Sequence, residues 1–262
     1  MKIPLYVIDA FTTRVFGGNP AAVCPLEAWL PDDVMQKIGQ ENNLSETAFF
    51  VRESEGAYGL RWFTPTIEVD LCGHATLASA FAIFNFLEAS ADAVTFNSRS
   101  GPLRVRRGDG ERLTLDLPAR RAEACETPAA LLDALGARPR EVLRSPVDYL
   151  AVYDTEDEVR ALRPDMTLLA SLDALGVIAT APGSASDCAS RYFAPAAGIP
   201  EDPVTGAAHC TLTPYWSEKL SKQEIHALQV SARGGELFCE AANERVRISG
   251  HAVRYSEGFL YV

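Results

Sequence analysis

A carboxylate that immediately precedes a hydrophobic segment is the first candidate for chemistry in this sequence. Glu46 ends a polar stretch and leads directly into residues 47–51, Thr-Ala-Phe-Phe-Val, a pattern typical of a buried strand. Burial disfavours a charged carboxylate and raises its pKa toward values that suit proton transfer. Glu46 is therefore a candidate general acid/base. A surface acid at a strand edge is the alternative, and position in the sequence alone does not choose between the two.

A second acidic residue, Asp202, lies before Pro203. Asp followed by Pro is typical of a helix start, in which Asp caps the first turn and Pro takes the first helical position. The alternative is a place in a functional site, because Asp202 falls on Cys72 when the chain is shifted by 130 residues against itself. The residues alone leave both interpretations open.

The segments around these two residues repeat one another. Four further positions coincide at the same shift: Arg61 with Arg191, Trp62 with Tyr192, Phe63 with Phe193 and Pro65 with Pro195. Both copies then enter a helical pattern. A repeat of about half the chain predicts two similar halves.

The helix expected over residues 74–88 is apolar on all sides, which indicates a helix buried in a core. It is too short for a membrane span, which needs about 20 apolar residues. The first amides of a buried helix lack intrahelical partners and, with the helix dipole, favour an anion such as a carboxylate. Two such helix starts, one in each half, predict that one acidic ligand is held between them.

Charge and cysteine content argue against several classes of protein. The net charge is −11, which argues against nucleic-acid and anionic-membrane partners. The six cysteines form no C-x-x-C pair and no His stands at zinc-ligand spacing, so we expect reduced thiols and no metal site. No glycine-rich nucleotide motif and no signal peptide are present, which predicts a cytoplasmic protein without a nucleotide cofactor.

The remaining patterns predict an α+β fold. Helices are expected at residues 31–41 and 127–136, and strands at residues 5–11, 93–98, 101–107, 111–117, 148–153, 176–180, 236–241, 245–249, 251–255 and 258–262. The composition changes near residues 118–126. We expect an N-terminal half of residues 1–118, which the C-terminal strand 251–262 can join, and a C-terminal half of residues 119–250. Their central helices are expected near 74–88 and 205–220.

Four ordered segments resemble the PhzF-like, phenazine-biosynthesis-type isomerases. They are residues 17–23, Gly-Gly-Asn-Pro-Ala-Ala-Val; 43–49, Asn-Leu-Ser-Glu-Thr-Ala-Phe; 68–76, Glu-Val-Asp-Leu-Cys-Gly-His-Ala-Thr; and 201–206, Glu-Asp-Pro-Val-Thr-Gly. The resemblance covers essentially the whole chain. It implies a fold related to that of diaminopimelate epimerase: two pseudo-symmetric halves, each a curled, mostly antiparallel sheet around a central helix, with the site in the cleft between them.

The resemblance also implies a chemistry, which is a cofactor-independent proton shift on a small carboxylate-bearing metabolite. Glu46 would move the proton on carbon, while His74 and Asp202 would orient the substrate or relay protons. The implied substrate-binding residues are Asn19, Gly73, Thr205, Gly206 and Ala207. For Asn19, a plain turn residue in Gly-Gly-Asn-Pro is the alternative.

Two departures from related families narrow this expectation. Related epimerases use one cysteine from each half, whereas this chain has Cys72 in one motif and Asp202 in the other, so a two-thiol racemase is not expected. The family's common Thr-Gly-Ser-Ala is Thr-Gly-Ala-Ala here. Ala207 therefore lacks a hydroxyl for a substrate carboxylate, which argues against the dihydro-hydroxyanthranilate substrate of the phenazine enzymes.

The competing class is a non-enzymatic small-molecule binding or interaction protein on the same scaffold. The joint presence of Glu46, His74 and Asp202 favours the enzyme. A homodimer is expected because it is the commonest assembly of soluble proteins.

Overall fold

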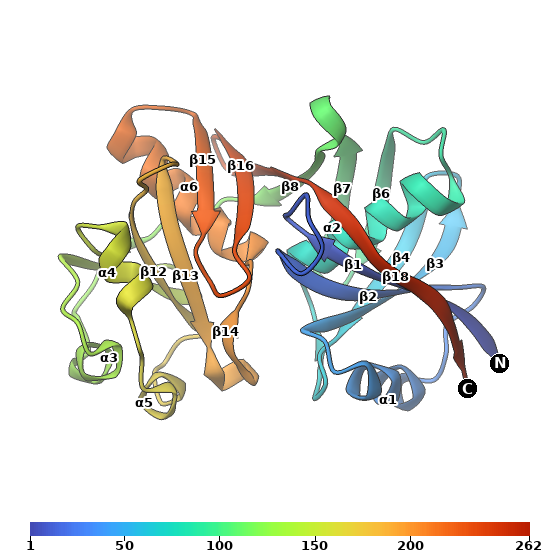
Figure 1. Ribbon diagram of the computed structural model, residues 1–262, viewed down its shortest axis with the longest axis horizontal. Coiled ribbons are helices and arrows are strands. Elements are labelled where there is room, and N and C mark those ends of the chain that lie inside the picture. Colours follow the sequence, from blue (N-terminus) through green and yellow to red (C-terminus); the bar gives the residue numbers. More distant parts are fainter. The chain divides into compact units, whose positions relative to one another are not determined.

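The chain forms two units, each built from a sheet and helices. The computed structural model describes residues 1–262 (Figure 1). Unit 1 comprises Met1–Asp116 and Ser249–Val262, and unit 2 comprises Leu117–Ile248. No helix is both long and apolar enough to cross a membrane.

Unit 1 contains most of the strands of the first half of the chain and the last strand. Its elements are β1 (Lys2–Ala10), β2 (Asn19–Leu26), α1 (Asp32–Asn42), β3 (Glu46–Ser54), β4 (Ala57–Phe63), β5 (Glu68–Val69), α2 (Gly73–Ala82) continued by the π-helical turn η1 (Ile83–Leu87), β6 (Ala93–Ser98), β7 (Gly101–Arg107), the 3-10 turn η2 (Asp109–Glu111), β8 (Leu113–Pro118) and β18 (Ala252–Tyr261). Strand β1 lies antiparallel to β18 and β2, β2 parallel to β3, and β3 antiparallel to β4. Strand β4 lies antiparallel to β5 and parallel to β6, which is antiparallel to β7.

Unit 2 repeats this order. Its elements are β9 (Glu123–Ala124), α3 (Ala129–Leu135), β10 (Glu141–Arg144), β11 (Asp148–Val152), α4 (Glu156–Ala161), α5 (Met166–Ala170), β12 (Gly176–Pro182), β13 (Cys188–Ala194), the 3-10 turn η3 (Pro195–Ala197), β14 (Ile199–Asp202), α6 (Gly206–Leu220), β15 (Glu224–Gln229), β16 (Gly235–Ala242) and β17 (Arg245–Gly250). Strand β10 lies antiparallel to β11, β11 parallel to β12, and β12 antiparallel to β13. Strand β13 lies antiparallel to β14 and parallel to β15, which is antiparallel to β16. The shared pairing pattern confirms the prediction of two pseudo-symmetric, mostly antiparallel halves.

One ion pair recurs in both units. The Arg61 guanidinium donates from Nε and Nη2 to the two carboxylate oxygens of Glu68, each at 2.7 Å. The Arg191 guanidinium donates in the same way to Glu201, at 2.7 and 2.8 Å. Such two-point pairs fix a side chain strongly in both position and angle. Each one ties the strand before the central helix, β4 or β13, to the short strand beside it.

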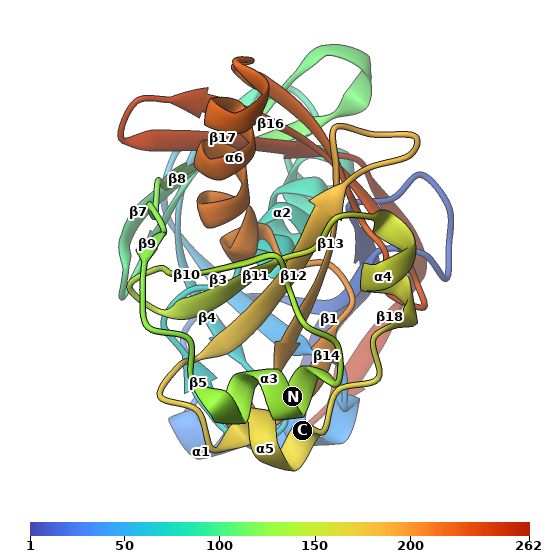
Figure 2. The same cartoon turned by 90° about the vertical axis from the view of Figure 1, so that its left-hand side faces the viewer.

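The helices pack against the sheets of their own units. Helix α2 is buried on nearly every face and contacts β1, β2, β3 and β18, as its all-round apolar sequence predicted (Figure 1). Helix α1 packs on β3 and β4, and its Met35 joins an apolar cluster with Phe49 and Phe63. In unit 2, α6 packs on β15 and β16 (Figure 1), while α4 contacts β12 and β13 (Figure 2).

The structure near the C-terminus differs from the prediction. Two strands were expected at residues 251–255 and 258–262, but β18 is continuous from Ala252 to Tyr261. Its backbone pairs with β1 over that whole length, and a register shift between Val7 and Ile8 absorbs the irregularity. Gly258 therefore lies inside a strand rather than in a turn.

Candidate active site

Glu46 and His74 lie together within unit 1. Helix α1 ends at Asn42. The next residue, Asn43, caps it with a left-handed backbone (φ 49°) that turns the chain, and Glu46 then opens β3 opposite Ala21 of β2. His74 is the second residue of α2. Both side chains are buried, with Glu46 7% and His74 3% exposed. The structure thus brings together two of the three residues for which a catalytic role was predicted.

The contact between them is an ion pair. Glu46 Oε2 lies 3.1 Å from His74 Nε2, yet this oxygen is buried and accepts no hydrogen bond from the protein. Burial by itself would lower the pKa of His74, but the facing Cys72 and Glu46 groups raise that pKa well above its usual value. Because a protonated Cys72 thiol carries no charge, the Glu46 carboxylate is the group that stabilises the imidazolium.

Cys72 is the third member of this cluster. Its Sγ lies 3.5 Å from His74 Nδ1 and 4.0 Å from Nε2, and it occupies the N-cap position of α2. Burial, followed by the charge of Glu46, raises the pKa of the Cys72 thiol to about 11. The thiol is therefore protonated at neutral pH. Ligand atoms of Glu46, Cys72 and His74 all lie within 4.8 Å of one another. Spacing along the sequence did not indicate this cluster, because Glu46 lies on β3 whereas Cys72 and His74 lie at the start of α2.

Asn19 holds the far side of the imidazole. Its Nδ2 lies 3.0 Å from His74 Nδ1, and Asn19 is fully buried as the first residue of β2. The turn before it needs Gly18 (φ 62°), where a side chain would meet the carbonyl oxygen of Ala10 at 2.1 Å. An amide can donate with its nitrogen or accept with its oxygen, so Asn19 can serve either protonation state of the ring. Its predicted substrate contact stays a prediction, while its contact with His74 is observed.

Asp202 and Thr205 form a second polar group, in unit 2. Asp202 ends β14 opposite Tyr192, and the N-cap of α6 is Thr205, so the interpretation of Asp202 as the helix cap is wrong. The Asp-Pro pattern does not mark the helix start here, because β14 continues to Asp202 and α6 begins only at Gly206. The Thr205 hydroxyl donates to Asp202 Oδ2 at 2.5 Å.

Gln229 orders this group and was not predicted. Its amide nitrogen donates to the Asp202 carbonyl at 2.8 Å and to Thr205 Oγ1 at 3.1 Å, while its carbonyl oxygen accepts from the Thr205 amide at 2.8 Å. Gln229 is the last residue of β15 and is buried. A single glutamine at a strand end carries no sequence signal for such a role.

Both central helices begin with glycine. Gly73 opens α2 and Gly206 opens α6, and no side chain caps either helix through a hydrogen bond. Ala207, which is half-buried, follows in the first turn of α6. Backbone amides at uncapped helix starts are donors suited to a carboxylate oxygen.

The position that corresponds to Glu46 in unit 2 carries no acid. Glu46 is paired with Ala21 across the parallel β2 and β3, and Gly176 is paired with Asp148 across the parallel β11 and β12. A side chain at Gly176 would meet Tyr192 Oη at 2.4 Å, and this hydroxyl donates to Asp148 Oδ1 at 2.8 Å. Tyr192 therefore fills the place that a carboxylate occupies in unit 1.

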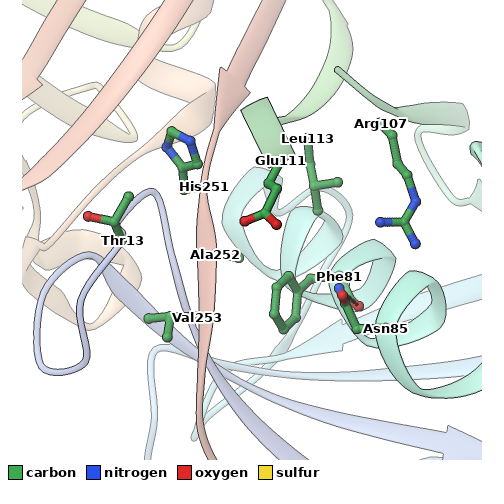
Figure 3. A pocket seen from close by; sticks show the side chains of 9 residues that line it. All are labelled: Thr13, Phe81, Asn85, Arg107, Glu111, Leu113, His251, Ala252 and Val253. Carbon is green, nitrogen blue, oxygen red and sulfur yellow. Dashed lines mark hydrogen bonds between the residues drawn. The ribbon is translucent and has the colours of Figure 1, made fainter. Parts of the chain in front are cut away.

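Unit 1 also contains a cavity of about 340 Å³ that is separate from these residues (Figure 3). It is lined by Thr13, Phe81, Asn85, Arg107, Glu111, Leu113, His251, Ala252 and Val253. Its most polar group, the Arg107 guanidinium, donates to the Phe84 carbonyl at 2.6 Å and lies 4.8 Å from the Phe84 ring centroid. Arg107 is thus engaged in holding the end of the central helix, and none of the predicted site residues lines this cavity.

Comparisons with known proteins agree with the architecture. A family model described as phenazine biosynthesis-like protein, PhzC-PhzF, matches residues 8–258. An uncharacterized isomerase of Pseudomonas aeruginosa is 52% identical over 98% of both chains. A crystal structure of a PhzF-family phenazine biosynthesis protein from Enterococcus faecalis covers 100% of both chains with a TM-score of 0.95 and 46% identity. A predicted epimerase of P. aeruginosa, at 21% identity and a TM-score of 0.77, shares the fold.

Proposed function

The chain belongs to the PhzC-PhzF family of phenazine biosynthesis-like proteins, and on that premise we propose that it is an isomerase. The reaction that we propose is a proton shift within a small carboxylate-bearing metabolite, carried out by side chains without a cofactor. The observation that carries this proposal is the buried Glu46 Oε2, which faces His74 and accepts no hydrogen bond.

Glu46 is the proposed general base. A carboxylate oxygen without a donor is ready to accept a proton, and its burial spares the reaction the cost of removing water from it. The substrate C–H bond breaks, an O–H bond forms on Glu46, and the electron pair delocalises into the conjugated part of the substrate. Glu46 then returns the proton to another carbon, so no electrons are gained or lost.

His74 is proposed to stabilise the charge that develops on the substrate. Its raised pKa keeps the imidazolium available as a donor near neutral pH, while Asn19 holds the opposite ring nitrogen. The uncapped amides at the start of α2 supply further donors for a substrate carboxylate.

We propose that Asp202 takes part in the same reaction as a proton relay for heteroatoms. The support is local: Asp202 is buried, and Thr205 and Gln229 fix its orientation. Buried acids held by such networks are suited to positioned proton transfer.

The test is exchange of substrate protons with solvent. The protein would be incubated in D₂O with a panel of unsaturated and amino carboxylates, and NMR would follow loss of carbon-bound protons. We expect exchange for at least one compound with the wild type and none with Glu46→Gln. Compounds that stabilise the wild type against heat without any exchange or conversion would instead favour a small-molecule binding protein.

A further inference from the structure

We propose that Glu46, Cys72 and His74 bind a divalent transition-metal ion of the Zn²⁺ class, and that this ion inhibits the protein by occupying Glu46. The metal site follows from the geometry of the cluster alone. Only the inhibition rests on the proposed function.

The three ligand atoms have the spacing of three corners of a tetrahedral site. His74 Nε2 lies 3.1 Å from Glu46 Oε2 and 4.0 Å from Cys72 Sγ, and the three atoms all lie within 4.8 Å of one another. Zinc bonds of about 2.0 Å to nitrogen or oxygen and about 2.3 Å to sulfur place tetrahedral ligands roughly 3.3–3.8 Å apart. The nitrogen–oxygen separation is slightly shorter than this range, and the nitrogen–sulfur separation is slightly longer.

One oxygen of Glu46 offers a position for a cation. Glu46 Oε2 is buried, lies 3.1 Å from His74 Nε2 and accepts no hydrogen bond of good geometry. A metal ion between Glu46 Oε2 and His74 Nε2 would replace the imidazolium proton as the positive charge beside this carboxylate. The ligands stand on β3 and at the start of α2, two regular elements of unit 1, so the site is largely preformed.

The imidazole has the outer partner that metal-binding histidines use. Coordination through Nε2 leaves a proton on Nδ1. Asn19 Nδ2 lies 3.0 Å from Nδ1, and a half-turn of the amide brings its oxygen there as the acceptor of that proton. A hydrogen bond to the remote nitrogen fixes the tautomer and the ring angle of a metal ligand.

The donor set selects the class of metal. One nitrogen, one sulfur and one carboxylate oxygen suit Zn²⁺ or Co²⁺, whereas Mg²⁺ and Ca²⁺ prefer oxygen ligands. Binding replaces the thiol proton of Cys72 and the Nε2 proton of the His74 imidazolium, and both protons pass to the buffer, so a carboxylate and a thiolate together balance the charge of the ion. Three protein ligands leave a fourth position for water.

Cobalt spectroscopy tests the site without any substrate. Co²⁺ titrated into the reduced wild type should give a thiolate-to-cobalt charge-transfer band and the visible bands of tetrahedral Co²⁺, and Zn²⁺ should displace them while Mg²⁺ does not. Cys72→Ser should abolish the charge-transfer band, and His74→Gln should weaken Co²⁺ binding about tenfold or more. Cys125→Ser is the matched control, because Cys125 is the one cysteine that is not fully buried, and it should leave the spectrum unchanged.

Three results would overturn the metal site: no thiolate band in the wild type, a band that survives Cys72→Ser, or a band that disappears with Cys125→Ser. If Cys72→Ser does not fold, protection of Cys72 in the wild type decides instead, since bound Zn²⁺ should slow alkylation of that thiol at least tenfold.

The inhibitory effect has its own readout. With a substrate identified, Zn²⁺ should reduce turnover and a chelator should restore it. Asp202→Asn should reduce turnover but leave the cobalt spectrum intact. A cobalt spectrum as described, found together with full activity of Glu46→Gln, would reject the proposed base and keep the metal site.

Discussion

Glu46 Oε2 and His74 Nε2 lie 3.1 Å apart in the interior of unit 1, joined as an ion pair across the start of β3 and the start of α2. Apart from this ion pair, the carboxylate oxygen accepts no hydrogen bond, and the neighbouring Cys72 and Glu46 groups raise the pKa of the imidazole. A base and a proton donor are therefore held side by side in one unit.

The first prediction separates Glu46 from Cys72. Glu46→Gln keeps the shape of the side chain and removes the base, so turnover of a confirmed substrate should fall by about a hundredfold or more. Cys72→Ala should keep substantial activity, because burial keeps this thiol protonated. Glu41→Gln, at an exposed position of α1, is the control and should be close to wild type. A loss in Cys72→Ala as large as that in Glu46→Gln would contradict this assignment.

The second prediction concerns stability at neutral and alkaline pH. The folded state holds the His74 proton more tightly than the unfolded chain, so the stabilisation is complete below the unfolded pKa of about 6.5. It is lost as the pH rises through the higher folded pKa. His74→Gln should therefore be less stable than the wild type near pH 6, and the difference in unfolding free energy should shrink as the pH rises through the folded-state pKa. Urea unfolding from pH 6 upward measures the difference in unfolding free energy between the two proteins. A difference that does not change with pH would argue against an imidazolium at this position.

The third prediction concerns acid. Burial lowers the pKa of His209 to about 4, and its Nδ1 lies 2.8 Å from the Thr205 carbonyl oxygen. Because the unfolded chain takes up this proton near pH 6.5, the wild type should lose about 3 kcal/mol of stability as the pH falls from about 6.5 to about 4. His209→Asn can keep the donor without titrating, so its stability should depend less on pH in this range.

The fourth prediction tests the difference between the two units. Gly176→Ala would place a methyl group 2.4 Å from Tyr192 Oη, and forcing these atoms apart should cost about 1–3 kcal/mol of unfolding free energy. Gly258→Ala, where no atom lies within 4 Å of the added carbon, should change stability little. Adding Tyr192→Leu to Gly176→Ala should remove the clash. Chemical denaturation measures all three, and equal stability of the two alanine variants would show that Tyr192 moves aside freely.

Much of the fold could be predicted because the apolar patterns and repeated motifs that indicate it lie within short stretches of sequence. The apolar residues around α2 predicted a buried helix, and the coincidence of Arg61 with Arg191 predicted the repeat that the two Arg–Glu pairs display. The prediction of two strands on either side of Gly258 was wrong. Residues 252–261 form one strand because they pair with β1, which lies at the opposite end of the sequence, so no local pattern could indicate it.

Local sequence patterns predicted the central helices, many of the strands, the repeated halves and the motifs that contain Glu46, His74 and Asp202, because periodicity, turn residues and motif spacing are properties of neighbouring residues. Which atoms meet is visible only in the folded chain. The tertiary structure placed the Glu46 carboxylate against His74 and Cys72, used Gln229 to orient Asp202 and Thr205, and filled the position equivalent to Glu46 with Tyr192 beside Gly176. These contacts join residues from different elements, so they depend on strand register and side-chain packing, which no local pattern records.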